Sequence, residues 1–248
     1  MFEFLSSLSL WGTIVNTLGV IAGALVGVII KRFSGGKKEK IKEGGLLSDL
    51  SDAIMKGVAL CVMLIGITGA IKTENIMVVI ISIVLGAVIG TLCHLDKGIS
   101  GIGDFIEKKT HGKLGSITQG FVTASLLFCV GAMAIVGSLN SGLTQDHTML
   151  YSKSLLDTIS AAIFASTLGW GVVFSSALVF LYQGVITLAA TWLSPVLSLA
   201  VINEMTAVGS LLIIALSLNM LGLTKIKVMN YVPAIFAPIF LLPLIQTL

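Results

Sequence analysis

Long runs of uncharged, apolar residues recur along this chain, and they constrain its fold more than any other feature. Runs of about 18 or more such residues are long enough to cross a hydrocarbon core about 30 Å thick. Charged residues make up 11% of the 248 residues, whereas soluble chains carry about 25%, and the mean hydropathy is +1.05. The sequence therefore predicts an all-α, polytopic transmembrane helical bundle in which residues 1–248 form a single integral membrane domain.

The apolar runs predict eight membrane spans. They lie at about Trp11–Ile30, Ile54–Ile71, Ile76–Leu95, Gln119–Leu139, Leu155–Gly169, Val172–Leu193, Thr206–Leu223 and Val228–Leu248. The first run has no basic residue before it and no small-x-small cleavage site after it, so we interpret it as a span rather than a cleaved signal peptide. The fifth and sixth spans divide one apolar stretch at Gly169-Trp170-Gly171, a natural turn, and a re-entrant segment there is the alternative.

Basic residues are unevenly distributed between the two sides of this arrangement. Residues 31–53 and 96–118 form two basic loops, and placing them in the cytoplasm leaves only Lys72 and Lys153 outside among the 15 basic residues. This asymmetry follows the positive-inside rule and predicts that both termini lie outside. A seven-span arrangement would move the two lysines before the last span to the outer side, so eight spans are favoured.

Each basic loop has two interpretations. The stretch "IGDFIEKKTHGKLG" mixes apolar and charged side chains as a short interfacial helix would, or it is a solvated linker. The cluster "KRFSGGKKEKIK" either contacts anionic lipid headgroups or serves only as a topology signal.

Three stretches of the chain resemble one another. They are "LCVMLIGITGAIK" from Leu60, "LLFCVGAMAIVGSLN" from Leu126 and "GSLLIIALSLNMLGL" from Gly209. Each is followed by a span that opens with a polar residue, which indicates that one helical hairpin is used repeatedly. The first span of the chain resembles a further copy of the second helix of this hairpin. By the charge distribution the last hairpin is inverted, an arrangement typical of secondary transporters. Similar composition of apolar helices is the alternative explanation.

Glycines in the first and third spans are spaced by four residues. They are Gly19, Gly23 and Gly27, and Gly86 and Gly90. Such stripes lack side chains and let another helix approach closely. We interpret them as helix-packing positions, within the molecule or in a homo-oligomer.

The last span contains Pro233, Pro238 and Pro243. Each proline removes a backbone donor and frees a carbonyl four residues earlier. Such carbonyls are tolerated in a membrane only where protein or a cavity satisfies them. We interpret this span as a broken, solute-facing helix, and a kinked packing helix is the alternative.

Few ionisable residues are expected inside the spans, so amides are the main candidates for a polar path. Asp157 follows Ser154 in a capping-box pattern at the start of the fifth span, and Glu204 has a similar explanation in the seventh. Gln183 lies at the centre of the sixth span, where a buried amide is costly unless hydrogen bonded. Four asparagines near span ends complete the candidates for a substrate or ion pathway: Asn16, Asn140, Asn219 and Asn230. Each of these residues either contacts the solute or serves as a structural hydrogen bond or cap.

Other classes of function lack their motifs. The chain has no P-loop or dinucleotide glycine motif, no nucleophile with a base on a neighbouring span, and three cysteines without metal or redox spacing. Its three histidines are scattered, and His147 beside Asp146 is predicted to be an exposed loop pair. We therefore expect no enzymatic activity, no catalytic residue, no metal, no cofactor and no nucleic-acid partner; the expected partners are the lipid bilayer and a small solute or ion.

Four stretches also resemble a known family: "GTIVNTLGVIAGALVG", "FVTASLLFCVGAMAIVGSLNSGL", "DHTMLYSKSLLDTISAAIFASTLG" and "NEMTAVGSLLIIALSLNMLGL". They are similar to the bacterial multi-pass family known as domain of unknown function 554, with YdfK- and YqgA-like members. The resemblance covers essentially the whole chain and implies a helical protein of the bacterial inner membrane. It brings no established activity, but it draws attention to Asn16, Asp157 and Glu204, which lie within these motifs.

Two functions remain open from the sequence. The first is a secondary transporter or channel for a small solute or ion, with a polar path between the repeated hairpins. The absence of a central charge favours a neutral solute or a cation held by carbonyl and amide oxygens, and it counts against proton exchange on a midplane carboxylate. The alternative is a non-transporting scaffold or sensor whose basic loops bind a cytoplasmic partner.

Overall fold

The computed structural model describes residues 8–34, 46–97 and 117–246, and within these ranges the chain forms helices and no strand. The elements are α2 (Trp11–Ser34), α3 (Leu46–Ala70), α4 (Ile76–Leu92), α6 (Ile117–Cys129), α7 (Ala132–Thr144), α8 (Thr148–Leu168), α9 (Gly171–Leu188), α10 (Ala190–Leu193), α11 (Leu199–Met220), the 3₁₀ helix η1 (Val228–Phe236) and α12 (Pro238–Gln246). The proposed interfacial helix and most of the basic cluster lie outside the described residues. Helix α3 begins at Leu46, inside the first predicted loop.

All eight predicted spans fall on helical segments. Among the described residues, four helices are long and apolar enough to cross a membrane, and the number rises to six if two bent pairs each count as one span. The bent pairs are α6 with α7, at 61°, and η1 with α12, at 48°. Helix α4 is apolar but shorter, at 17 residues. The helical membrane class is confirmed, and the number of eight crossings stays a prediction.

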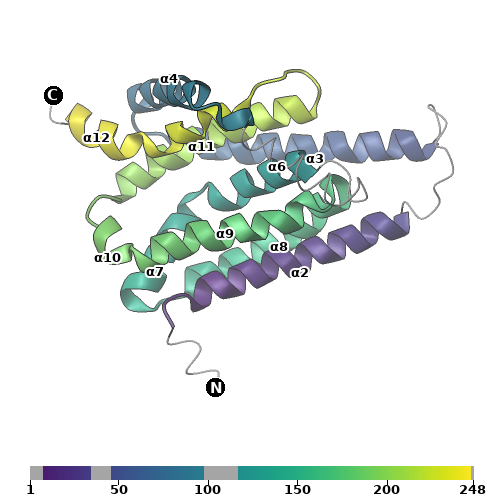
Figure 1. The fold of residues 1–248 in the computed structure, drawn as a ribbon, viewed down its shortest axis with the longest axis horizontal. Helices are drawn as coiled ribbons and strands as arrows, with labels where there is room; N and C mark the ends of the chain where they lie inside the picture. The colour runs from purple at the N-terminus through teal and green to yellow at the C-terminus, as the bar shows by residue number, and fades with distance from the viewer. Residues whose placement is uncertain (1–7, 35–45, 98–116, 247–248) are drawn as a thin grey trace.

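The helices divide into two lobes (Figure 1). In the first lobe α2 packs on α8 and α9, and α6 and α7 pack on α8 and α9. In the second lobe α3 packs on α11, and α4 packs on η1 and α12. Helix α11 also contacts α4, η1 and α12. The lobes meet through a smaller interface, where α11 touches α6 and α7 and α3 touches α8.

The glycine stripes lie against neighbouring helices of the same lobe. A Cβ at Gly19 would be 2.5 Å from both hydroxyl oxygens of Ser154 and Thr158, and one at Gly23 would overlap the Thr158 carbonyl. Because the contacts advance together along both helices, α2 and α8 are parallel. The stripe therefore serves contacts inside the molecule and gives no support for a homo-oligomer.

The corresponding contacts in the second lobe run in opposite directions. A Cβ at Gly86 would be 2.5 Å from the backbone nitrogen of Ala234, and one at Gly90 would overlap the carbonyl of Asn230. Increasing numbers on α4 meet decreasing numbers on η1, so these two helices are antiparallel. Helices α3 and α11 are antiparallel too, since the Ser217 hydroxyl donates to the carbonyl of Ala59 at 2.7 Å while Gly69 faces Ser210.

Basic residues gather at one end of the bundle. Lys31 and Arg32 lie in the last turn of α2, and the ammonium of Lys31 donates to the Thr167 carbonyl near the end of α8 at 2.7 Å. The loop from α11 to η1, with Lys225 and Lys227, lies at the same end, beside the start of α6. We call this the basic end.

The outer faces of the helices are apolar. On α8 the exposed residues Leu155, Leu156, Ile159 and Ile163 are 53–66% exposed, whereas Lys153 and Asp157 on the opposite face are buried. A soluble helix shows the reverse pattern, with charges outside. The bundle is thus adapted to contact lipid, and its polar side chains turn inward.

Candidate functional site

Four buried polar residues meet in the first lobe, and we call them the polar cluster. They are Asn16 from α2, Lys153 and Asp157 from α8, and Gln183 from α9. Asn16 and Gln183 are fully buried, and Asp157 and Lys153 are 6% and 7% exposed. Three of these residues, Asn16, Asp157 and Gln183, are sequence candidates that lie far apart in the chain and are brought together by the packing of α2 on α8 and α9.

An ion pair forms the centre of the cluster. The ammonium of Lys153 contacts both carboxylate oxygens of Asp157, at 2.8 and 2.6 Å. The residues are four apart on one helix, the spacing at which side chains meet. Because both side chains are about nine-tenths buried, water does little to screen the pair, and each charge depends on the other for its stability.

The two amides of the cluster form an incomplete hydrogen-bond network. Asn16 Nδ2 donates to Asp157 Oδ2 at 3.1 Å and to Gln183 Oε1 at 3.2 Å, which uses both of its hydrogens. Asn16 Oδ1 and Gln183 Nε2 are buried without a hydrogen-bond partner among the described residues. The cluster thus presents one free acceptor and one free donor within the protein interior.

The capping role that the sequence suggests for Asp157 is wrong. Helix α8 begins at Thr148, so Asp157 is its tenth residue, and the Ser154 hydroxyl donates to the Val15 carbonyl of α2 at 3.1 Å instead of capping α8. The first two turns of this helix mix polar residues with Met149 and Leu150 and precede the apolar run, so the apolar pattern gives no sign of them. Lys153, expected in an outer loop, is carried into the interior with it.

A helix break lies beside the cluster. Helix α6 ends at Cys129 and α7 starts at Ala132, with Gly131 between them at φ 138°, a backbone conformation that favours glycine. The Cys129 thiol is close enough to interact electrostatically with Lys153 and Asp157. Across the lobe interface, Val130 packs where a Cβ at Gly209 of α11 would stand. The break therefore joins the polar cluster to the interface between the lobes.

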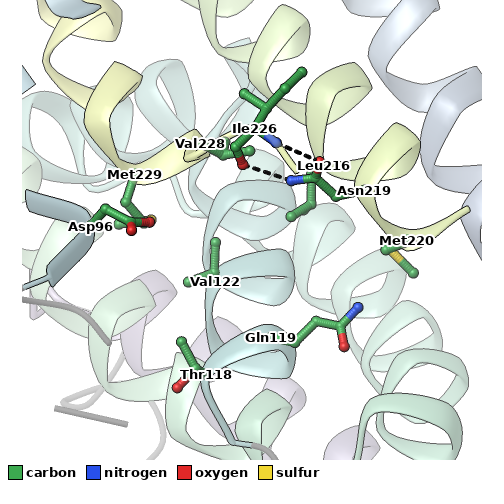
Figure 2. Close-up of a pocket in the computed structure, with 10 residues that line it drawn as sticks. All are labelled: Asp96, Thr118, Gln119, Val122, Leu216, Asn219, Met220, Ile226, Val228 and Met229. Atoms are coloured by element: carbon green, nitrogen blue, oxygen red, sulfur yellow. Dashed lines mark hydrogen bonds between the residues drawn. The ribbon is translucent and has the colours of Figure 1, made fainter. Parts of the chain in front are cut away.

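A cavity of about 330 Å³ opens between the lobes at the basic end (Figure 2). Thr118, Gln119 and Val122 of α6 line one side. The other side is lined by the end of α11, the following loop and η1, together with the ionisable residue Asp96.

One face of α6 extends from this cavity towards the helix break beside the polar cluster. Thr118, Val122, Ser125 and Cys129 are spaced by four, three and four residues, so they share a helix face. The face begins in the cavity and ends at the helix break, over about 16 Å at 1.5 Å per residue. Ser125 is 5% exposed, and its hydroxyl has no hydrogen-bond partner in the described part of the chain.

Polar groups continue from the cluster towards the opposite end of the lobe. The hydroxyls of Thr13 and Thr187, one turn further along α2 and α9, are 3.4 Å apart and buried. Beyond them the Ser141 hydroxyl donates to the Ser9 carbonyl at 2.6 Å and lies 2.8 Å from His147 Nδ1. His147 is 5% exposed, so its predicted exposure in a loop is wrong.

Glu204 lies outside the cluster, in the second lobe. Its carboxylate accepts from the Thr73 hydroxyl at 2.6 Å and from the backbone nitrogens of Glu74 and Asn75 at 2.7 and 3.0 Å. Helix α11 begins at Leu199 with Ser198 as its N-cap, so Glu204 does not cap its own helix. It holds the loop from α3 to α4.

The remaining asparagines also lie outside the cluster. Asn219 accepts from the Ile226 nitrogen and donates to the Ile226 carbonyl beside the cavity (Figure 2). It also accepts from the Thr224 hydroxyl, so it closes the loop after α11. Asn230 accepts from the backbone nitrogen of Asp96 at 2.9 Å. Asn140 is half-buried in the last turns of α7.

The three prolines lie in the last bent pair. Pro233 is inside η1, Pro238 opens α12 after the 48° bend, and Pro243 is inside α12. The first segment is a 3₁₀ helix, whose i to i+3 hydrogen bonds differ from those of an α-helix. Of the described residues, no three or more His, Cys, Asp or Glu come together as metal ligands.

The fold and the site define a helical membrane protein with a charged pair held in its interior. The chain belongs to the family described as "Protein of unknown function (DUF554)", whose model matches residues 11–242. The resemblance found in the sequence is thereby confirmed.

Two relatives match most of the chain. It is 28% identical over 233 residues to the "Uncharacterized membrane protein YdfK" of Bacillus subtilis (strain 168), covering 92% of this chain and 94% of that protein. It is 29% identical over 229 residues to the "Uncharacterized protein YqgA" of Escherichia coli (strain K12), covering 90% and 92%. No solved structure matches the chain. A relative named a membrane protein and the apolar helices together support a membrane location.

Proposed function

We propose that this protein is a secondary transporter for a small solute or ion, with a path that leads from the cavity between the two lobes to the polar cluster inside the first lobe. The observation that carries this proposal is the polar cluster, where two fully buried amides each leave one polar atom without a partner among the residues that the structure describes. Such atoms cost about 1–3 kcal/mol each when left unpaired. A solute, ion or water that enters the bundle would supply the missing partners.

A series of polar groups along the bundle supports this path. It begins in the cavity at the basic end, follows Ser125 on α6, and reaches the polar cluster beside the helix break. From there Thr13 and Thr187 lead towards the opposite end. A scaffold or sensor has no requirement for buried polar groups along the full length of its bundle.

Movement of one lobe against the other would open and close the cavity end of this path. The lobe interface is small, and two bent helix pairs lie at it. The pair α6 and α7 contacts α11 across the interface, and the pair η1 and α12 borders the cavity through η1. Broken helices at a midplane site and two bodies that rock against each other are recurring features of carriers. We therefore favour a carrier over a channel.

The internal repeat fits the same scheme. The helices assigned as second elements of the hairpins pair with one another, α2 with α8 and α4 with η1. Helix α3 is antiparallel to α11, and α4 is antiparallel to η1. This is the relation expected of two inverted hairpins. We propose that all eight helical segments cross the membrane, that the basic end is cytoplasmic, and that both termini lie outside.

Flux measurements in proteoliposomes would test this function. Sodium, potassium, proton and anion gradients are imposed in turn, with current recorded on a solid-supported membrane and internal pH followed with entrapped pyranine. Wild type should give flux under at least one gradient. Gln183→Leu should abolish it while the protein stays folded, and Phe180→Leu, on the exposed face of the same helix, should retain it. Equal flux in wild type and Gln183→Leu would refute a path through the cluster.

A further inference from the structure

We propose that the polar cluster binds a short, uncharged polyol through its hydroxyl groups, and that Ser138 of α7 is a further residue of this site. The proposal rests on the function proposed above, because it names the class of solute that the path would carry. Binding at the cluster can nevertheless be measured without transport.

Helices α6 and α7 together run in the same direction as α9, and this relation fixes the level of Ser138. At the start of α6, a Cβ at Gly171 of α9 would be 2.6 Å from the backbone nitrogen of Phe121. At the end of α7, a Cβ at Gly142 would overlap the carbonyl of Thr187, near the end of α9. The contacts thus advance together along the two stretches of chain.

Ser138 comes to the level of the polar cluster. It precedes Gly142 by four residues, and Gln183 precedes Thr187 by four, so each is about one turn before that contact. Helix α7 packs on both α8 and α9, and Ser138 is fully buried. Its hydroxyl has no hydrogen-bond partner among the described residues. A third free polar atom therefore joins those of Asn16 and Gln183.

The three free atoms differ in the partners that they require. Asn16 Oδ1 only accepts a hydrogen bond, Gln183 Nε2 only donates one, and the Ser138 hydroxyl does both. An ammonium group only donates and a carboxylate only accepts, so neither can satisfy all three atoms. A hydroxyl donates and accepts from one rotatable atom. Because the free atoms come from α2, α7 and α9, a molecule with several hydroxyls matches them best.

The ion pair of the cluster disfavours a charged solute. The Lys153 ammonium contacts both carboxylate oxygens of Asp157, at 2.8 and 2.6 Å, so the two charges already balance each other. A cation that enters would approach the ammonium, and an anion would approach the carboxylate. Either would also leave a net charge in an apolar interior, where it is expensive.

Uncharged hydroxyls continue on both sides of the cluster. Thr118 lines the cavity, and Ser125 on the same face of α6 is buried with a hydroxyl that no other described residue binds. Beyond the cluster, the hydroxyls of Thr13 and Thr187 lie 3.4 Å apart. Selectivity of a membrane path follows from the hydrogen-bonding groups that line it, and these groups suit a hydroxylated solute.

Saturation-transfer NMR of the protein in nanodiscs of perdeuterated lipid would test binding. Glycerol is compared with two charged molecules of similar size, the cation of 2-amino-1,3-propanediol and the anion glycerate, and with urea as a neutral amide. Wild type should transfer saturation to glycerol and not to the charged molecules. No transfer to glycerol, or stronger transfer to a charged molecule or to urea, would overturn the proposal.

Ser138→Ala is the sharpest variant because it removes a hydroxyl that no described residue binds. It should weaken glycerol binding about two- to tenfold, as loss of one neutral hydrogen bond does, and leave the thermal midpoint unchanged or higher. A structural hydroxyl would show the reverse. The matched control is Ser82→Ala, which removes another fully buried hydroxyl without a partner among the described residues, but from α4 of the second lobe. It should leave glycerol binding unchanged.

Gln183→Leu should abolish glycerol binding, since it removes the free donor and releases the Asn16 amide. Equal binding in wild type, Ser138→Ala and Gln183→Leu would overturn the site, because glycerol would then bind elsewhere and the cluster would hold water alone.

Uptake of labelled glycerol into proteoliposomes separates this inference from the transport proposal. Glycerol binding without uptake, and without flux under the ion gradients above, would retain the site and refute the transporter. Flux of an ion without glycerol binding would retain the transporter and refute the site.

Discussion

The buried ion pair of α8 makes a specific prediction about stability. In Lys153→Met the Asp157 carboxylate keeps only its hydrogen bond from Asn16, and in Asp157→Leu the ammonium loses both of its contacts at 2.6 and 2.8 Å. Both side chains are about nine-tenths buried, so the charge that remains cannot be hydrated. Each single variant should therefore lower the free energy of unfolding by about 3–5 kcal/mol.

The paired variant Lys153→Met/Asp157→Leu should behave differently. It replaces both charges by apolar side chains of similar volume, and such replacements are often neutral or stabilising by about 1–4 kcal/mol. The paired variant should thus be at least as stable as wild type, so the two substitutions are strongly non-additive, as expected for residues in direct contact.

Reversible unfolding in mixed micelles, followed by circular dichroism, would measure all four proteins. Lys72→Met, which removes an exposed lysine, serves as the control and should change stability by less than about 0.5 kcal/mol. If the single variants cost no more than this control, Lys153 and Asp157 are hydrated, and the account of a buried pair is refuted.

Three further predictions concern the packing and the loops, and thermal unfolding in detergent checks each one. Gly23→Val should destabilise the protein by about 1–3 kcal/mol because the new side chain would force α2 away from α8. The control Gly57→Val, with nothing within 4 Å of its Cβ, should be nearly neutral. Equal effects of the two substitutions would contradict the close approach of α2 and α8. Glu204→Gln should cost about 1.5–3 kcal/mol through weaker charge-assisted bonds to the α3–α4 loop, and the exposed Glu74→Gln should not. Gly131→Ala should cost about 1–3 kcal/mol because φ is 138° there; an unchanged midpoint would show that the break does not require glycine.

The sequence predicts the helices well because lipid imposes a simple pattern on them. Each apolar run corresponds to a helical segment, and the glycines spaced by four lie where α2 meets α8 and α4 meets η1. Proline also marks the bent last helix. The break between α6 and α7 is harder to find because Gly131 is one of many glycines in apolar runs, and nothing local distinguishes it.

The site was only partly visible in the sequence. Asn16, Asp157 and Gln183 stand out as polar residues in or near apolar runs, but their meeting depends on the parallel packing of α2 on α8, which is a tertiary feature. Lys153 does not stand out because it lies before the apolar run, in a segment of mixed polar and apolar residues that suggests a loop. The spacing of Lys153 and Asp157 by four residues was the one available signal, since it places opposite charges on the same helix face.

Glu204 shows how one residue type in the sequence fits two different roles. A carboxylate near the start of an apolar run resembles a pathway residue, yet in the fold it binds the backbone of a loop from another hairpin. Residue type and depth in the sequence do not distinguish these roles, because the loop that it holds is 129–131 residues away along the chain.

The central claim is that a polar path runs along α6 from the cavity to the cluster, and the reactivity of a cysteine at position 125 tests it most directly. The three native cysteines are first replaced by alanine: Cys61, Cys93 and Cys129. Ser125→Cys should then react in proteoliposomes with a charged, membrane-impermeant methanethiosulfonate, while Leu156→Cys, on the lipid-facing side of α8, should not. A Ser125→Cys protein that is folded but as unreactive as Leu156→Cys would contradict the path.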